Sequence, residues 1–155
     1  MNILVINGPN LNLLGIREPE IYGTDTLEEL MLWLENCPEC IDHNFKFYQS
    51  NHEGDIIDYI QDERQWAQGI IINPGALAHY SYAIYDALKA VNIKSVEVHL
   101  SDIFKRDKFR KKSVIEPACV KQISGLGKQS YLEAIQNGEI SLRYPLKYSN
   151  ADNGY

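Results

Sequence analysis

The sequence has few cysteines, no long apolar run and no excess of positive charge. Its three cysteines are too few for the disulfide framework of a small secreted protein, so we expect reduced thiols. The formal net charge of −6 disfavours a nucleic-acid-binding protein or one that binds an anionic membrane surface. No segment has the pattern of a transmembrane helix or a signal peptide. We therefore expect a cytoplasmic protein with no nucleic-acid or membrane partner.

The pair Cys37-Pro-Glu-Cys40 has the spacing of a redox motif but not its setting. In a thioredoxin-type motif the first cysteine opens a helix, where the helix dipole favours the thiolate. Here the pair follows the first expected helix, and no second pair of ligands has the spacing of a structural zinc site. We therefore predict no redox centre and no zinc at these cysteines.

Two kinds of apolar segment alternate along the chain. Short apolar runs predict strands at residues 3–6, 45–48, 69–72, 95–99 and 120–124. Helical spacing of apolar residues predicts helices that follow Thr26 and that cover residues 55–66, 83–91 and 129–136. The first of these helices begins with a capping box, Thr26-Leu-Glu-Glu29. Helices that alternate with strands predict a parallel sheet covered on both faces.

This pattern predicts an α/β fold in a single domain at residues 1–140. Because crossovers between parallel strands are right-handed, we expect a flavodoxin-like, doubly wound, five-stranded parallel sheet of order 2-1-3-4-5. Residues 141–155 are polar and aperiodic. We expect them to form a C-terminal tail that is mobile or packs between subunits.

The segment at residues 8–23 follows the first expected strand and contains three glycines and two prolines. So many glycines and prolines favour an irregular loop, and long loops in small domains are commonly lids or binding loops. The segment carries Asn10, Arg17 and Tyr22. A cation five residues from a tyrosine on one loop can stabilise the phenolate.

Polar residues follow three of the expected strands. In an open parallel sheet, ligands bind beyond the carboxyl ends of the strands, where the strand order reverses. The expected topology brings five polar residues to that edge: Asn10, Asn73, His79, His99 and Ser101. Taken singly, Asn73-Pro-Gly is more often a simple turn, and a lone histidine is more often structural than catalytic. Their convergence favours a binding or catalytic site.

Three further features bear on the chemistry of this edge. Glu97 and His99 lie on the same face of one strand, so Glu97 can orient the imidazole, and a metal site on this pair stays an alternative. The cationic run at residues 105–112 favours an anionic small molecule as ligand. Gly125-Leu-Gly127 is weak evidence for NAD, and Pro9 disfavours an FMN phosphate loop after the first strand.

Four blocks of the sequence together resemble type II 3-dehydroquinate dehydratase. They are residues 7–23, Asn73-Pro-Gly-Ala-Leu-Ala-His79, Glu97-Val-His-Leu-Ser101 and Arg106-Asp-Lys-Phe-Arg110. The resemblance covers residues 1–139 and implies anti elimination of water from 3-dehydroquinate through an enolate, in the shikimate pathway, without metal or cofactor. A flavodoxin-like module that binds FMN or a partner protein is the alternative from a different class.

The resemblance also implies a role for each matching residue. Tyr22 would be the base, Arg17 would support its phenolate, Asn10 would hold the water that stabilises the enolate oxygen, and His99 would be the acid. Since burial under a lid opposes the phenolate, we expect Arg106 to act as a second cation. The implied substrate-binding residues are Asn73, His79, Asp86, Leu100, Ser101 and Arg110. Asp86 would enter the site from a neighbouring subunit of a homododecamer, which is a tetramer of trimers.

Overall fold

The computed structural model describes residues 1–138 and residue 140. Its five parallel strands have the order β2-β1-β3-β4-β5, as the alternating pattern predicted. The strands are β1 (Asn2–Asn7), β2 (Asn44–Gln49), β3 (Gly69–Asn73), β4 (Ser95–His99) and β5 (Lys121–Ser124). The helices are α1 (Pro19–Tyr22), α2 (Leu27–Glu35), α3 (Glu53–Asp62), α4 (Tyr82–Val91) and α5 (Gln129–Gln136). The predicted tail at residues 141–155 lies outside the described residues.

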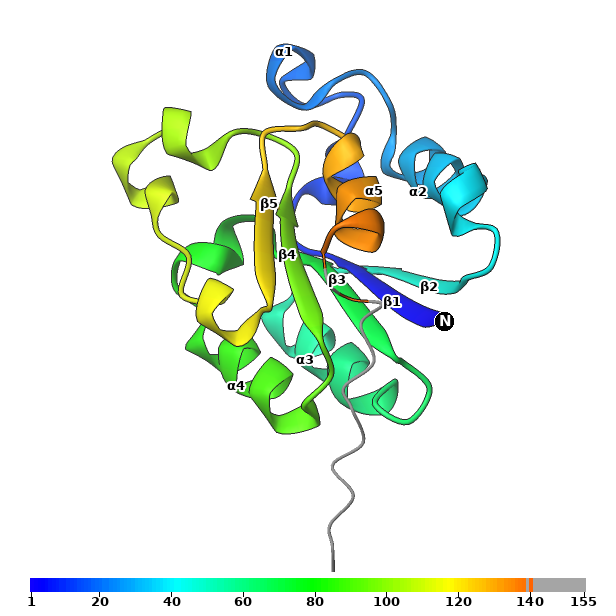
Figure 1. The fold of residues 1–155 in the computed structure, drawn as a ribbon. Coiled ribbons are helices and arrows are strands. Elements are labelled where there is room, and N and C mark those ends of the chain that lie inside the picture. Colours follow the sequence, from blue (N-terminus) through cyan, green and yellow to red (C-terminus); the bar gives the residue numbers. More distant parts are fainter. Residues whose placement is uncertain (139, 141–155) are drawn as a thin grey trace, which may run out of the picture.

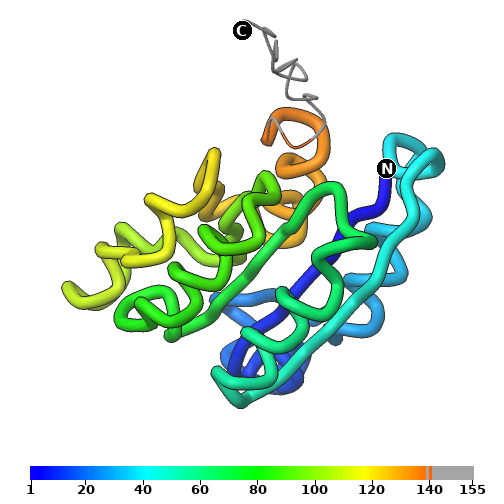
Figure 2. The backbone as a smooth tube through the Cα atoms, turned by 90° about the horizontal axis from the view of Figure 1, so that it is seen from below, coloured from blue at the N-terminus to red at the C-terminus, as the bar shows by residue number. Residues whose placement is uncertain are grey.

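The helices cover both faces of the sheet and leave three layers (Figure 1). Helices α2 and α5 pack on one face against side chains such as Ile3, Val5 and Val98. Helices α3 and α4 lie side by side on the other face, where they pack against Leu4 and Ile72 (Figure 2). Because the central strands β1 and β3 are buried on both faces, their inner residues at 3–6 and 70–72 are all apolar rather than alternating.

Local sequence signals set the ends of two helices. At the start of α2, Thr26 Oγ1 accepts from the Glu29 N–H at 3.2 Å, and Glu29 Oε2 accepts from the Thr26 N–H at 2.8 Å. This is the predicted capping box. At the start of α4, the Ser81 hydroxyl accepts from the Ile84 N–H, and at its end Asn92 adopts a left-handed conformation with φ of 53°. Asparagine tolerates that conformation better than most residues do, so Asn92 ends the helix as expected.

The predicted helix at residues 55–66 is wrong at its C-terminal end. Helix α3 stops at Asp62, and the next residues turn toward β3. Lys46 and Tyr48 of β2 each donate to the Glu63 carboxylate, at 2.6 and 2.8 Å, and Lys46 Nζ lies 4.6 Å from the Trp66 ring centroid. These contacts with β2 hold the chain after Asp62 out of the helix.

The expectation of an irregular loop at residues 8–23 is also corrected. The segment contains a 3₁₀ helix at Leu11–Leu13 and the four-residue helix α1. Pro19 occupies the first turn of α1, where its missing N–H costs nothing and its fixed φ favours the helix. Leu11 and Leu14 are buried and anchor the first part of the segment to the core. We call residues 8–23 the lid segment.

Among the described residues, no helix is both long enough and apolar enough to cross a membrane.

Candidate active site

A cavity of about 170 Å³ lies at the carboxyl ends of the strands, beneath the lid segment. Ten of the twelve residues that the sequence singled out line it: Asn10, Arg17, Tyr22, Asn73, His79, His99, Leu100, Ser101, Arg106 and Arg110. The sheet topology thus brings residues 100 positions apart in the chain into one small space. We call it the inner cavity.

The other two predicted residues lie outside the inner cavity. Glu97 is fully buried next to His99, where it can act on the imidazole but does not line the cavity. Asp86 is exposed on α4 and does not line the cavity of its own chain. The structure therefore joins Glu97 to the site through His99 and leaves Asp86 apart from it.

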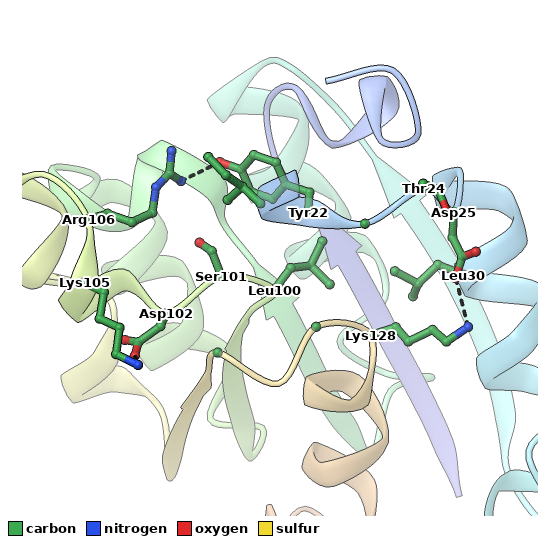
Figure 3. Close-up of a pocket in the computed structure, with 14 residues that line it drawn as sticks. Tyr22, Thr24, Asp25, Leu30, Leu100, Ser101, Asp102, Lys105, Arg106 and Lys128 are labelled. Carbon is green, nitrogen blue, oxygen red and sulfur yellow. Dashed lines mark hydrogen bonds and ion pairs between the residues drawn. The ribbon is translucent and has the colours of Figure 1, made fainter. Parts of the chain in front are cut away.

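Two arginines flank Tyr22, the last residue of α1. The Tyr22 hydroxyl accepts from Arg106 Nη1 at 2.5 Å, and Figure 3 shows Arg106 reaching toward it. The Arg17 guanidinium carbon lies 5.1 Å from the Tyr22 ring centroid, and that of Arg106 lies 5.3 Å from it. Glu18 Oε2 lies 3.5 Å from Arg17 Nε and 4.0 Å from Arg106 Nη2. Two cations and one anion therefore surround this tyrosine, and Arg106 makes the direct contact with its oxygen.

His99 lies at the end of β4 and is backed by a carboxylate. Its Nε2 lies 2.5 Å from Glu97 Oε1, and the His99 side chain is 7% exposed. Among the described residues, Nδ1 of His99 makes no hydrogen bond, and His99 lines the inner cavity. When Glu97 is ionised it can only accept, so Nε2 carries the hydrogen and Nδ1 is the nitrogen left for a ligand.

A chain of buried hydrogen bonds fixes the ends of β1 and β3. Tyr131 of α5 donates from its hydroxyl to Asn7 Oδ1 at 2.6 Å and accepts from Asn73 Nδ2 at 3.0 Å. Burial raises the pKa of Tyr131, against a smaller opposing effect of the hydrogen bond from Asn73, so its hydroxyl stays protonated as this donation requires. Asn73 Oδ1 also accepts from the Gly75 N–H at 3.3 Å. The predicted Asn-Pro-Gly turn is therefore both a turn and part of the cavity wall.

The strand ends approach each other closely beside the cavity. The Gly8 N–H donates to the Asn73 carbonyl at 2.8 Å, and a Cβ at Gly8 would lie 2.5 Å from the Pro74 carbonyl oxygen. Only glycine allows this approach. Asn10 then adopts a left-handed conformation with φ of 68°, and its N–H donates to Asn51 Oδ1.

Basic side chains form the far wall of the inner cavity. His79 Nδ1 lies 2.8 Å from the Lys112 carbonyl oxygen, so Nδ1 carries the hydrogen and Nε2 is not used by this bond. Arg110 Nε donates to Asp107 Oδ2 at 3.1 Å, which restrains the guanidinium. With Arg17 and Arg106, these residues make the cavity suitable for a small anion.

A second, larger cavity of about 690 Å³ also borders Tyr22 (Figure 3). It shares Tyr22, Leu100, Ser101 and Arg106 with the inner cavity, and an ion pair of 2.9 Å between Lys128 and Asp25 lies at its wall. Size alone would favour it as the site. We assign the chemistry to the inner cavity, because His99, His79 and Arg110 line only that one.

Three residues at the site were missed by the sequence analysis. Gln122 Nε2 donates to Glu97 Oε1 at 3.1 Å, and Ser113 Oγ donates to Glu97 Oε2 at 2.8 Å. Glu18 lies near both arginines of Tyr22. Gln122 pairs in register with Glu97, so a polar residue at the middle of the fifth predicted strand was a usable signal. The only signal for Glu18 in the sequence was its position beside Arg17. The sequence gives no signal for Ser113.

The described cysteines and acidic residues add no second centre. Within residues 1–138 and 140, no three histidine, cysteine, aspartate or glutamate side chains are grouped as metal ligands would be. Cys37 and Cys40 are free and buried, and burial raises the pKa of Cys40 to about 11. These thiols are therefore protonated near neutral pH, unlike the thiolate of a redox motif.

Fold and site together define a doubly wound α/β protein with a tyrosine flanked by arginines and a histidine backed by a carboxylate in one cavity. The family model described as dehydroquinase class II matches residues 1–138. The chain belongs to this family. The predicted family and its enzyme class, a hydro-lyase, are thereby confirmed.

Two relatives of known name agree with this membership. A protein of Caldicellulosiruptor saccharolyticus named 3-dehydroquinate dehydratase is 58% identical over 136 residues, which cover 86% of this chain and 92% of that protein. A protein of the same name in Clostridium acetobutylicum is 51% identical over 135 residues, 87% of this chain and 94% of that one.

A solved structure supports the fold assignment. The crystal structure of a type II dehydroquinase from Butyrivibrio crossotus superposes with a TM-score of 0.85 at 51% identity, covering 88% of this chain and 95% of that one. The predicted flavodoxin-like fold with its strand order is therefore confirmed.

Proposed function

We propose that this chain catalyses the anti elimination of water from 3-dehydroquinate to give 3-dehydroshikimate. Tyr22, as phenolate, takes a proton from C2, and the electron pair moves onto the C3 carbonyl oxygen to form an enolate. The enolate then restores the carbonyl and expels the C1 hydroxyl, which takes a proton from His99 and leaves as water. The observation that carries the proposal is that Tyr22, in contact with Arg106, lines the same small cavity as His99.

The charges around Tyr22 support its role as base. One cation about 4 Å from a phenolate contributes about 4 kcal/mol at an effective dielectric constant of about 20. Glu18 opposes part of this stabilisation because its carboxylate lies near both guanidinium groups. Two arginines with one glutamate leave a net positive charge of one beside the phenolate. Arg106 therefore supplies the direct hydrogen bond, and Arg17 adds the charge that offsets Glu18.

The surroundings of His99 support its role as acid. Glu97 accepts from Nε2, so a protonated imidazole is stabilised in place and directs Nδ1–H into the cavity. Asn10, on the first turn of the lid segment, lines the same cavity and holds the water that stabilises the enolate oxygen. No step of this route uses a metal or a cofactor.

The remaining lining residues bind the substrate. Arg110 and His79 carry the charge and hydrogen bonds for its carboxylate and hydroxyl groups, together with Asn73 and the backbone of Leu100 and Ser101. A cavity of about 170 Å³ suits one small ring rather than an extended ligand.

Asp86 and the assembly follow from the same proposal. The family resemblance implies that Asp86 completes the site of a neighbouring subunit in a homododecamer, a tetramer of trimers, and its exposed position on α4 outside its own cavity is compatible with that role. Residues 1–140 form the catalytic domain, which acts in the cytoplasm in the shikimate pathway.

The direct test is to incubate the protein with 3-dehydroquinate and follow the ultraviolet absorbance of the conjugated enone product. We expect the absorbance to rise, and we expect the rate of this rise to be unchanged by EDTA and by borohydride. Loss of activity with EDTA would indicate a metal, and inactivation by borohydride in the presence of substrate would indicate an imine intermediate. No rise in absorbance would contradict the proposed function.

A further inference from the structure

We infer that Ser113 is a positioning residue that fixes the tautomer of His99 by holding the Glu97 carboxylate as a hydrogen-bond acceptor. Ser113 lies between the arginine-bearing segment at residues 105–112 and β5, and it does not line the inner cavity. It therefore acts on the reaction through Glu97 and His99. Only the catalytic consequence rests on the proposed function, since the hydrogen bonds can be tested without substrate.

The hydroxyl of Ser113 has a complete set of partners. Its oxygen accepts from the Ile115 N–H and from the Glu116 N–H, each at 3.1 Å. A serine hydroxyl has two acceptor lone pairs and one hydrogen. Because two backbone donors occupy both lone pairs, the single hydrogen is directed to Glu97 Oε2, 2.8 Å away. The direction of this hydrogen bond is thus set by the backbone of residues 113–116.

Glu97 in turn receives hydrogen bonds at both carboxylate oxygens. Ser113 donates to Oε2, and Gln122 of β5 donates to Oε1 at 3.1 Å. Glu97 is completely buried, so no water competes for these positions. Donors at both oxygens favour the carboxylate over the carboxylic acid, which leaves Oε1 as an acceptor for His99. His99 therefore carries its hydrogen on Nε2.

The tautomer decides which nitrogen of His99 serves the cavity. With Nε2–H bonded to Glu97, Nδ1 is the atom that takes and gives the transferable proton. Without Ser113, Glu97 Oε2 would be buried without a donor, which favours protonation of the carboxyl group. A protonated Glu97 can donate to Nε2, and His99 would then place its hydrogen on Nδ1 without the carboxylate needed to stabilise the imidazolium.

A purely structural role for Ser113 makes a different prediction. The two backbone N–H groups that donate to Ser113 lie at the start of a short 3₁₀ helix, Glu116–Ala118. In a purely structural role, the hydroxyl would do no more than cap this helix. In that case its loss would lower stability and leave the imidazole of His99 unchanged. Ser95 of β4 offers a matched control, because its buried hydroxyl donates to the Ile93 carbonyl at 3.0 Å and makes no hydrogen bond with Glu97 or His99 among the described residues.

The test uses the whole chain labelled with ¹⁵N in its histidine rings. Ring nitrogen shifts report the tautomer, and the signals of His99 among the four histidines are assigned by their loss in His99→Asn. We compare the wild type with Ser113→Ala, Ser113→Thr and Ser95→Ala. We expect the Nε2–H form of His99 in the wild type, Ser113→Thr and Ser95→Ala, and a loss of that form in Ser113→Ala.

Turnover of 3-dehydroquinate supplies the second readout. We expect kcat of Ser113→Ala to fall at least 10-fold, with kcat of Ser113→Thr and Ser95→Ala within about 3-fold of the wild type. An unchanged His99 tautomer in Ser113→Ala, or equal kcat losses in Ser113→Ala and Ser95→Ala, would overturn the inference. A wild type that fails to turn over 3-dehydroquinate would contradict the proposed function instead, and the ring nitrogen shifts would still decide the role of Ser113.

Discussion

The two halves of the candidate site are held in different ways. The lid half consists of Arg17, Glu18, Tyr22 and Arg106, and the strand half consists of Glu97, His99, Ser113 and Gln122. In the lid half, the side chains of Arg17 and Glu18 are 34% and 43% exposed, and their contacts are ion pairs of 3.5 to 4.0 Å. In the strand half, Glu97 and His99 are 0% and 7% exposed, and their hydrogen bonds are 2.5 to 3.1 Å long.

In the proposed mechanism, this difference means that the acid is held by buried hydrogen bonds and that the base lies on a more exposed segment. Buried groups must have their partners in place at all times, because an unpaired buried charge is costly. Half-exposed ion pairs are weak and exchange readily with water. In the proposed mechanism, closing the lid segment excludes water and holds the base against its two cations. The following predictions test this contrast, from the largest expected effect to the smallest.

Removing the acid should have the largest effect on the strand half. We expect His99→Ala to lower kcat by about 10²- to 10⁴-fold, because general acid catalysis contributes in this range. His52→Ala is the matched control, since His52 lies before α3 and does not line the inner cavity. Steady-state kinetics with 3-dehydroquinate measure both. Equal kcat values for the two variants would show that His99 is not the acid.

Removing either cation of the lid half should have an intermediate effect. We expect Arg106→Ala to lower kcat by about 100-fold, a loss typical of one charged donor, and Arg17→Ala to lower it less because Arg17 does not touch the Tyr22 oxygen. In Arg106→Ala the rise of kcat with pH should move to higher pH, since the phenolate loses its hydrogen bond. If the pH profile of Arg106→Ala were unmoved while Arg17→Lys shifted it upward, Arg106 would not be the second cation.

The two glutamates should differ in their effect on stability. We expect Glu97→Gln to lower the free energy of unfolding by about 3 kcal/mol, because an amide cannot accept from all three donors in that buried position. Glu18→Gln should change it by no more than about 0.5 kcal/mol, as an exposed ion pair contributes little. Urea unfolding monitored by circular dichroism measures both. Similar losses would contradict the contrast between the halves.

A small, pH-dependent effect on stability concerns Cys119, which packs beside Glu97. Burial, followed by the charges of Glu97 and Glu116, raises the pKa of the Cys119 thiol. A thiol whose pKa is higher in the folded state than in the unfolded state favours the folded state as long as it stays protonated. This stability is fully present below the unfolded pKa of about 8.5 and is lost as pH rises, because the thiol then ionises in the unfolded state. Between pH 8 and pH 9 we expect the free energy of unfolding of the wild type to fall by about 0.7 kcal/mol because of Cys119. This fall should be absent in Cys119→Ala. The same pH dependence in both proteins would mean that the thiol is not in a dry environment.

Much of the strand half could be predicted from the sequence. The bounds of β4 at Ser95–His99 match the prediction, since its β-branched valines alternate with polar residues at the period of a strand. The spacing of Glu97 and His99 placed both side chains on one face, and the sheet topology then placed His99 with His79 and Ser101. Ser113 could not be predicted, because its contact with Glu97 depends on the path of an irregular segment that has no periodicity.

The lid half was predictable in three of its four residues, all but Glu18, but not in its geometry. Arg17 and Tyr22 were singled out by their spacing, and Arg106 was expected as a second cation. The helix α1 was not predicted, because prolines were interpreted as helix breakers and Pro19 instead starts a helix. Arg17 was expected to support the phenolate with Arg106 as a second cation, and in the structure Arg106 is the residue that donates to the hydroxyl. Contacts between distant segments of this kind depend on tertiary packing.

Replacing the Tyr22 hydroxyl tests the central claim most directly, because Tyr22→Phe removes one oxygen atom and leaves the ring beside both arginines. The measurement is kcat for dehydration of 3-dehydroquinate, together with the dissociation constant of the substrate. We predict that kcat falls at least about 10³-fold while the dissociation constant stays within about 3-fold of that of the wild type. A variant that turns over 3-dehydroquinate at the wild-type rate would contradict Tyr22 as the base.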